Sequence, residues 1–112
     1  MTSFEFGDVV LVAFPFTDQT TRKQRPAVVV SSAAYQRSRP DLILLAVTSQ
    51  LRPSASVGEA AILGWQEAGL LKPSVLKPIV TTVDQRLIRR RLGHLVAADL
   101  TTLRRVLGEI IG

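Results

Sequence analysis

The stretch FPFTDQTTRKQRPAVVVSS, residues 14–32, joins two apolar segments through eight residues, TDQTTRKQ, that contain no large apolar side chain. The apolar segments, DVVLVAF at 8–14 and AVVVS at 27–31, have the length of strands and are rich in β-branched residues. Gly7 and Pro15 bound the first segment, and Pro26 opens the second. We therefore expect two strands joined by a polar loop, with Arg25 at the mouth of the second strand.

Neither segment alternates between apolar and polar residues, so both faces of each strand are expected to be buried. This pattern predicts curved central strands, as in a small barrel. Further strands are predicted at 42–49, near 59–63, at 75–83 and from 87 to about 93, and a helical turn at 32–38 with Ser32 as its N-cap. Pro78 has no N–H to donate, so the strand that contains it needs an edge position or a bulge.

Apolar residues recur at helical spacing near the C-terminus, at Leu100, Leu103, Leu107 and Ile110. They predict one amphipathic helix from about Ala97, with Asp99 in its first turn, where a carboxylate favours the helix dipole. Several short strands and one closing helix predict a mainly β fold with α, a small β-barrel with a C-terminal helix, in a single domain over residues 1–112.

Composition excludes several classes of protein. The chain has no cysteine and one histidine, His94, which excludes thiolate and histidine-cluster metal sites, and we expect no metal and no cofactor. No uncharged run approaches the roughly 20 apolar residues that span a bilayer. The N-terminus MTSFEFGD has two acids and no basic region, so it is not a signal peptide, and we expect a cytoplasmic protein. A mean hydropathy of +0.24 in 112 residues favours a homodimer, since one small core hides limited apolar surface.

The charge balance is basic. Fourteen Lys and Arg against nine Asp and Glu give a net charge of +5 and a pI near 10.8. Such an excess favours polyanions such as nucleic acid, through long-range attraction and counterion release. The same charge also keeps a small protein soluble, so composition leaves both interpretations open.

Six short blocks, taken in order and with compatible spacing, give the chain a family resemblance. They are GDVVLVAFPFTD (7–18), RPAVVVSS (25–32), LLAVTSQ (44–50), AGLLKPSV (68–75), TTVD (81–84) and LGHL (92–95). Together they resemble the PemK/MazF toxins of toxin-antitoxin systems over most of the chain. The resemblance implies an SH3-like barrel, a homodimer, an endoribonuclease that cleaves single-stranded RNA, and a small antitoxin that neutralises it.

The same resemblance implies that Arg25 and Thr48 are the catalytic residues. RNA cleavage without a metal needs the ribose 2′-OH deprotonated, the charge on a pentacoordinate phosphorus stabilised and the 5′-oxygen protonated. Arg25 suits the second task, because a guanidinium is always charged and its forked donors match phosphate oxygens. The Thr48 hydroxyl could donate to a phosphate oxygen or orient the 2′-OH.

Other polar residues are expected to contact RNA around this pair. They are Thr17, Arg22, Lys23, Gln24, Ser49, Gln50, Ser74 and Lys77. The basic cluster RLIRRR at 86–91 is either a further RNA contact or the solvated face of a strand. His94 has no second histidine with which to share acid–base catalysis, so a structural role is favoured.

Two alternatives of other classes stay open on the sequence. One is a non-catalytic SH3-like binding module, and the other is a same-fold toxin that inhibits DNA gyrase. The presence of both Arg25 and Thr48 favours the ribonuclease, because neither alternative needs the pair. KPIV at 77–80 stands where several relatives have a Glu-Gln pair that reads bases, so base selectivity is open.

Overall fold

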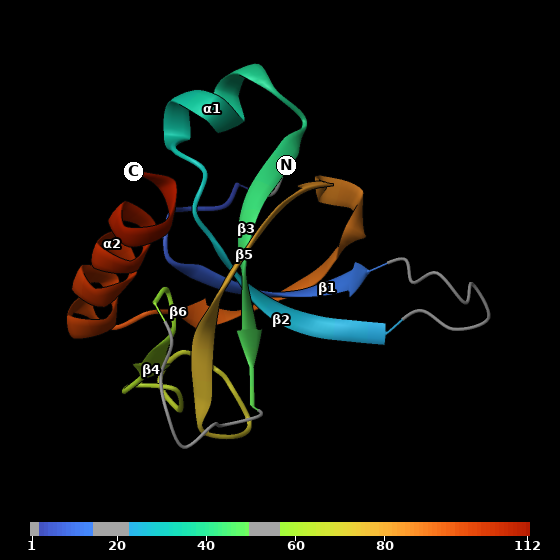
Figure 1. The fold of residues 1–112 in the computed structure, drawn as a ribbon. Helices are drawn as coiled ribbons and strands as arrows, with labels where there is room; N and C mark the ends of the chain where they lie inside the picture. Colours follow the sequence, from blue (N-terminus) through green and yellow to red (C-terminus); the bar gives the residue numbers. More distant parts are fainter. Residues whose placement is uncertain (1–2, 15–22, 50–56) are drawn as a thin grey trace.

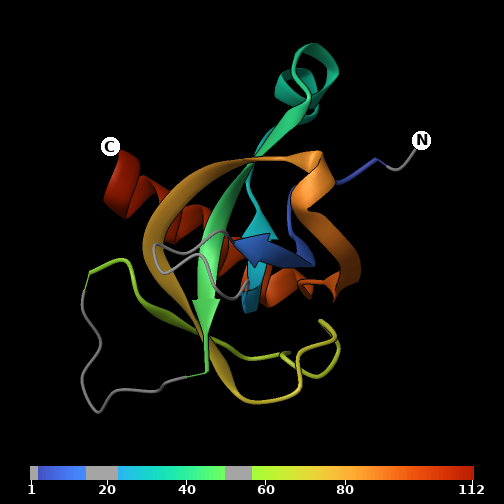
Figure 2. The same ribbon diagram turned by 90° about the vertical axis from the view of Figure 1, so that its right-hand side faces the viewer.

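The computed structural model describes residues 3–14, 23–49 and 57–112, which form one curled antiparallel sheet with helices at its side and end (Figure 1). The sheet has six strands in the order β4-β5-β3-β2-β1-β6. Figure 2 shows β5 curving around the central strands, so the sheet forms a half-barrel with β4 and β6 as its edges. The strands are β1 (Asp8–Phe14), β2 (Lys23–Val29), β3 (Asp41–Thr48), β4 (Ala60–Ile62), β5 (Ser74–Asp84) and β6 (Ile88–His94).

The helices are α1 (Ala33–Ser38), α2 (Ala97–Ile111) and a short 3-10 turn, η1 (Gln85–Leu87). The Ser32 hydroxyl accepts from the Tyr35 N–H at 3.1 Å, as predicted for the N-cap of α1. The mainly β fold with a closing helix is confirmed, and α2 begins at the predicted residue. In the part of the chain that the structure describes, no helix is long and apolar enough to cross a membrane.

The central strands bury both faces in two separate hydrophobic clusters. Val9 of β1 and Val28 of β2 point into the cluster that α2 covers with Leu103 and Val106. Their chain neighbours, such as Val29, point into the second cluster, on the inner side of the curl. Successive strand residues face opposite ways, so two apolar faces require continuous apolar runs. This explains why the opening segments do not alternate.

Strand β2 begins four residues earlier than the predicted start at residue 27, and this expectation was wrong. Lys23 and Gln24, expected in the loop, pair with Phe14 and Ala13 of β1. The ladder uses backbone groups, so polar side chains do not end it while β1 continues. Arg25 therefore lies inside β2 rather than at its mouth, opposite Val12.

The proline in β5 lies at a change of register. Leu45 pairs with Val80 and Val47 with Leu76, so residues 77–79 of β5 lie opposite a single residue of β3. The β4 ladder ends at Leu76, before Pro78 is reached. This irregularity accommodates the missing N–H, as the sequence predicted.

Asp99 ties α2 to the turn at 63–70. Its side chain is 1% exposed and accepts from the backbone N–H groups of Leu63 at 2.9 Å and Gly64 at 2.8 Å. These bonds add to the helix-dipole effect predicted for Asp99. At the end of the turn, Gly69 has a φ of +84°, and a Cβ there would lie 2.0 Å from the Leu92 carbonyl oxygen. Only glycine lets the turn approach β6 so closely.

Candidate functional site

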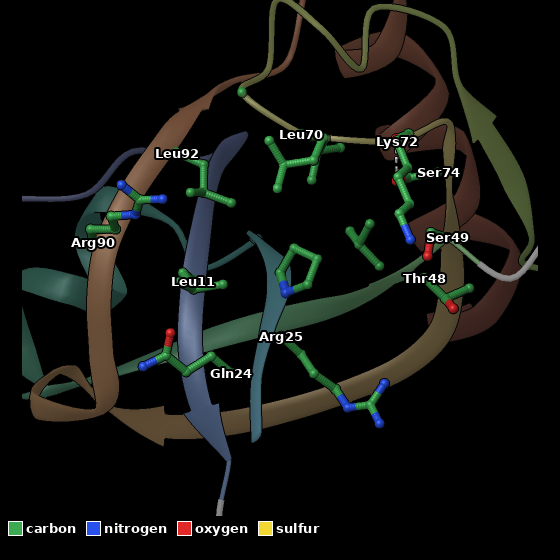
Figure 3. A pocket seen from close by; sticks show the side chains of 14 residues that line it. Leu11, Gln24, Arg25, Thr48, Ser49, Leu70, Lys72, Ser74, Arg90 and Leu92 are labelled. Carbon is green, nitrogen blue, oxygen red and sulfur yellow. Dashed lines mark hydrogen bonds between the residues drawn. The ribbon is translucent and has the colours of Figure 1, made fainter. Parts of the chain in front are cut away.

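Arg25 of β2 and Thr48 of β3 lie on neighbouring strands at one end of the sheet. The ladder between these strands ends at the pair Ala27–Ala46, two residues before Arg25 and Thr48, and the strands diverge beyond it (Figure 1). Arg25 is exposed and Thr48 is half-buried. Figure 3 shows the Arg25 guanidinium extending from β2 toward the side on which Thr48 lies.

A cavity of about 560 Å³ opens at the same end of the sheet. Its apolar floor comes from one side chain each of β1, β2, β3, β6 and the turn at 63–70: Leu11, Pro26, Val47, Leu92 and Leu70. Its polar residues are Gln24, Arg25, Thr48, Ser49, Lys72, Ser74 and Arg90. Among the described residues that line it, three are cationic and none is an Asp or Glu. The lining therefore favours an anion with an apolar part.

The cavity floor and the Arg25–Thr48 pair come from opposite faces of the same end of the sheet. Leu11 pairs with Pro26 on one side and with Arg90 on the other, so these three form a row across β2, β1 and β6. Successive residues of a strand face opposite ways, so Arg25 points away from Pro26. In Figure 3 the Leu11, Leu70 and Leu92 side chains gather at the centre, with Arg90 at one end and Thr48 at the other. A ligand that crosses this end of the sheet can contact both the apolar floor and the Arg25–Thr48 pair.

The structure brings together three of the predicted RNA-contacting residues. Gln24, Ser49 and Ser74 line the cavity with Arg25 and Thr48. The buried Ser74 hydroxyl donates to the Lys72 carbonyl at 2.8 Å, which fixes the wall that carries the Lys72 amine. The contact of these residues with RNA stays a prediction.

The other predicted contacts are elsewhere or outside the described residues. Lys77 does not line the cavity, and its amine is paired with the Glu59 carboxylate. An RNA contact by Lys77 stays a prediction that must compete with this ion pair. Thr17, Arg22 and Gln50 lie outside the described residues, as does the side chain of Lys23.

Sequence reasoning did not name Lys72 or Arg90 as a site residue, and it considered Arg90 only within the basic cluster at 86–91. Lys72 lies in the AGLLKPSV block. Arg90 and Leu92 both line the cavity, but the ladder between β1 and β6 is irregular on either side of Arg90, so the strand period alone does not indicate which arginine lines it. Lys72 follows the turn that Asp99 holds, and its place depends on that long-range contact.

The arginines of the basic cluster at residues 86–91 lie in different surroundings. Arg86 donates to Asp84 at 3.1 Å, and this bond, with one from the Arg86 backbone N–H, lowers the pKa of the Asp84 carboxyl below its usual value. Arg91 pairs with Asp8 at 3.0 Å and lies over the Phe4 ring. Arg90 is in the cavity. The cluster is therefore not a uniform RNA patch.

Glu5, Asp8 and His94 form a group of potential metal ligands, with ligand atoms within 4.8 Å of one another. None of the three lines the cavity. The buried Asp8 carboxylate lies 2.8 Å from His94 Nδ1 and also accepts from the Glu5 N–H at 2.8 Å. These bonds join the N-terminal turn to the end of β6, which is a structural task for His94.

The sequence model for PemK-like, MazF-like toxins of type II toxin-antitoxin systems matches residues 5–111. The chain belongs to this family. The predicted resemblance is thereby confirmed over nearly the whole chain. No curated protein sequence gives a significant match.

Solved structures of toxins have the same fold. A mycobacterial endoribonuclease in complex with its cognate antitoxin is 17% identical with a TM-score of 0.80, covering 98% of this chain and 96% of that one. The Mycobacterium tuberculosis toxin MazF-mt6 is 19% identical, with a TM-score of 0.71 and coverage of 93% and 95%. The structure of MazE-MazF from Deinococcus radiodurans is 26% identical with a TM-score of 0.73, covering 96% of this chain and 95% of that one.

Proposed function

We propose that this PemK/MazF family member is a toxin endoribonuclease that cleaves single-stranded RNA without a metal. The observation that carries the proposal is that Arg25 of β2 and Thr48 of β3 line the same cavity, together with the cationic residues Lys72 and Arg90. Family membership supports it. Incubation of the purified protein with a mixed RNA pool in EDTA is the test.

The proposed reaction is an internal transesterification. The ribose 2′-OH loses its proton, and the 2′-oxygen attacks the adjacent phosphorus. The bond from phosphorus to the 5′-oxygen breaks, and that oxygen takes up a proton. The products are a 2′,3′-cyclic phosphate and a 5′-hydroxyl, so neither water nor a cofactor is consumed.

Arg25 stabilises the charge that develops on the phosphoryl oxygens. Its forked donors match two such oxygens, and the strand holds the backbone from which they extend. A guanidinium gives up its proton reluctantly, so electrostatic stabilisation is its main task and proton transfer a secondary one. The Thr48 hydroxyl donates to a non-bridging oxygen or orients the 2′-OH. A binding module or a gyrase inhibitor has no use for this pair.

The active form is expected to be a homodimer. Several large apolar side chains are exposed in the single chain, among them Val57 at 76%, Leu63 at 74% and Ile79 at 56%. Covering such side chains is favourable by about 25 cal/mol per Å² of apolar surface. Light scattering at tens of micromolar, roughly the concentration at which a weak specific complex forms, should give twice the chain mass. A monomer at that concentration counts against the dimer.

A small, acidic, partly disordered antitoxin is expected to bind across residues 22–25 and the cavity. The cationic lining attracts an acidic segment, and a segment that folds on binding covers a large surface. RNA cleavage should therefore stop in the stoichiometric complex and return when the antitoxin is digested. Full-rate cleavage by the intact complex would refute occlusion.

A further inference from the structure

We propose that Arg90, at one end of the cavity, pairs with the phosphate of the nucleotide next to the cleaved linkage. This inference rests on the proposed function and deepens it. Arg25 and Thr48 act on the scissile phosphate, whereas Arg90 positions the strand. The ligand class is a single-stranded nucleic acid.

The spacing of the cationic groups supports two phosphate contacts. Leu11 lies opposite both Arg90 and Pro26, so the Cα atoms of Arg90 and Pro26 are two strand spacings apart, on the order of 10 Å. Arg25 is the chain neighbour of Pro26, and in Figure 3 its guanidinium extends away from the end of the cavity at which Arg90 lies. The two arginines are therefore placed to contact two different phosphates of one RNA strand.

Arg90 is also available for a ligand. Within the described ranges no carboxylate pairs with it, whereas Arg86 and Arg91 are paired with Asp84 and Asp8. Arg90 is exposed at the end of the cavity, where Figure 3 shows its guanidinium beside Leu92. An arginine without an anionic partner at a hollow surface is suited to bind a phosphate.

The shape and chemistry of the cavity fit a nucleotide. Its volume of about 560 Å³ lies within the range of small-ligand sites. A nucleotide has an apolar base face and an anionic phosphate, which matches the leucine floor and the cationic end. Gln24 and Ser49 at the rim can donate to base edges or accept from them. An acidic antitoxin segment could also reach Arg90, but its carboxylates would leave most of the apolar floor unused.

The test compares two adjacent arginines of β6. Arg90→Gln removes the charge in the cavity, and Arg89→Gln is the matched control, because Arg89 is also exposed and does not line the cavity. The probe is a random-sequence, single-stranded RNA pool with every 2′-hydroxyl methylated, which cannot be cleaved. Binding is followed by fluorescence anisotropy in EDTA over a range of NaCl concentrations, and thermal unfolding checks each variant.

Arg90→Gln is expected to weaken binding roughly tenfold, as for one lost charge-assisted hydrogen bond. The slope of log K against log salt should fall in magnitude by about 0.7, the value for one phosphate of a single strand. Arg89→Gln should change the affinity for the RNA probe by less than about twofold, because an exposed charge away from the bound RNA is screened by salt. Arg90→Lys should keep the slope and lose part of the affinity.

The outcomes separate this inference from the proposed function. If the two glutamine variants have equal affinities and salt slopes while the wild type cuts RNA, the inference is overturned and the function stands. If the probe binds in an Arg90-dependent way and RNA is not cut, the inference stands and the catalytic proposal fails. If Arg90→Gln weakens an acidic antitoxin peptide and leaves the probe unchanged, the site is a protein site and the inference is overturned. Absence of any probe binding overturns both.

Discussion

Replacing Arg25 by alanine is expected to slow RNA cleavage by about 10² to 10³ while the free energy of unfolding changes by less than about 0.5 kcal/mol. The loss in rate is that of one preorganised donor to a developing oxyanion, about 3 to 4 kcal/mol. Stability should hardly change because the Arg25 side chain is exposed. Single-turnover cleavage and thermal unfolding of the variant measure both quantities.

Two further variants test the role assigned to the guanidinium. Arg25→Lys keeps the charge and loses the planar fork, so we expect it to retain a small part of the activity. Thr48→Ala should lose about tenfold to a hundredfold, because a neutral hydroxyl is the weaker hydrogen-bond partner. If Arg25→Ala unfolds the protein, or cuts RNA at nearly the wild-type rate, then Arg25 is a structural residue of β2.

A 2′-deoxy nucleotide on the 5′ side of the cut linkage is expected to block cleavage there completely. The reaction uses that ribose hydroxyl as its nucleophile, and no other group in the mechanism replaces it. The measurement is gel electrophoresis of a short substrate with one known cut site, with and without the substitution, in EDTA.

The matched control for this experiment is the same substitution two nucleotides away, which should leave the rate nearly unchanged. Binding of the two substrates should be similar, since the phosphates are the same. Efficient cutting at the deoxy position would mean that water or another nucleophile attacks the phosphorus. The internal transesterification would then be wrong, whatever the role of Arg25.

The buried elements were the predictable part of the fold. Strand β1 (Asp8–Phe14) and the start of α2 at Ala97 lie where the sequence placed them. Burial determines the sequence pattern of both elements: β1 is a continuous apolar run, and the apolar residues of α2 recur with a 3.6-residue period. The start of β2 was missed because backbone pairing with β1 carries Lys23 and Gln24 into the ladder, and this pairing leaves no mark on side-chain type.

The site was predictable only in part, for a similar reason. Arg25, Thr48 and three polar neighbours were chosen from the family resemblance, and the fold gathers them at one cavity. Arg90 was not singled out because a run of arginines does not indicate which of them lines the cavity, and the irregular pairing of β6 with β1 leaves no regular period in the sequence. The Lys77–Glu59 pair joins residues 18 apart in the chain, which no local pattern indicates.

The central claim is that this chain cuts RNA through Arg25 without a metal, and mapping of the cut ends in EDTA tests it most directly. Purified protein is incubated with a mixed RNA pool, and the 5′ ends are sequenced before and after kinase treatment, with Arg25→Ala prepared in parallel. The account predicts new ends with a 5′-hydroxyl, at defined sequences, that are nearly absent with Arg25→Ala. No new ends in EDTA, or ends that carry a 5′-phosphate, would contradict it.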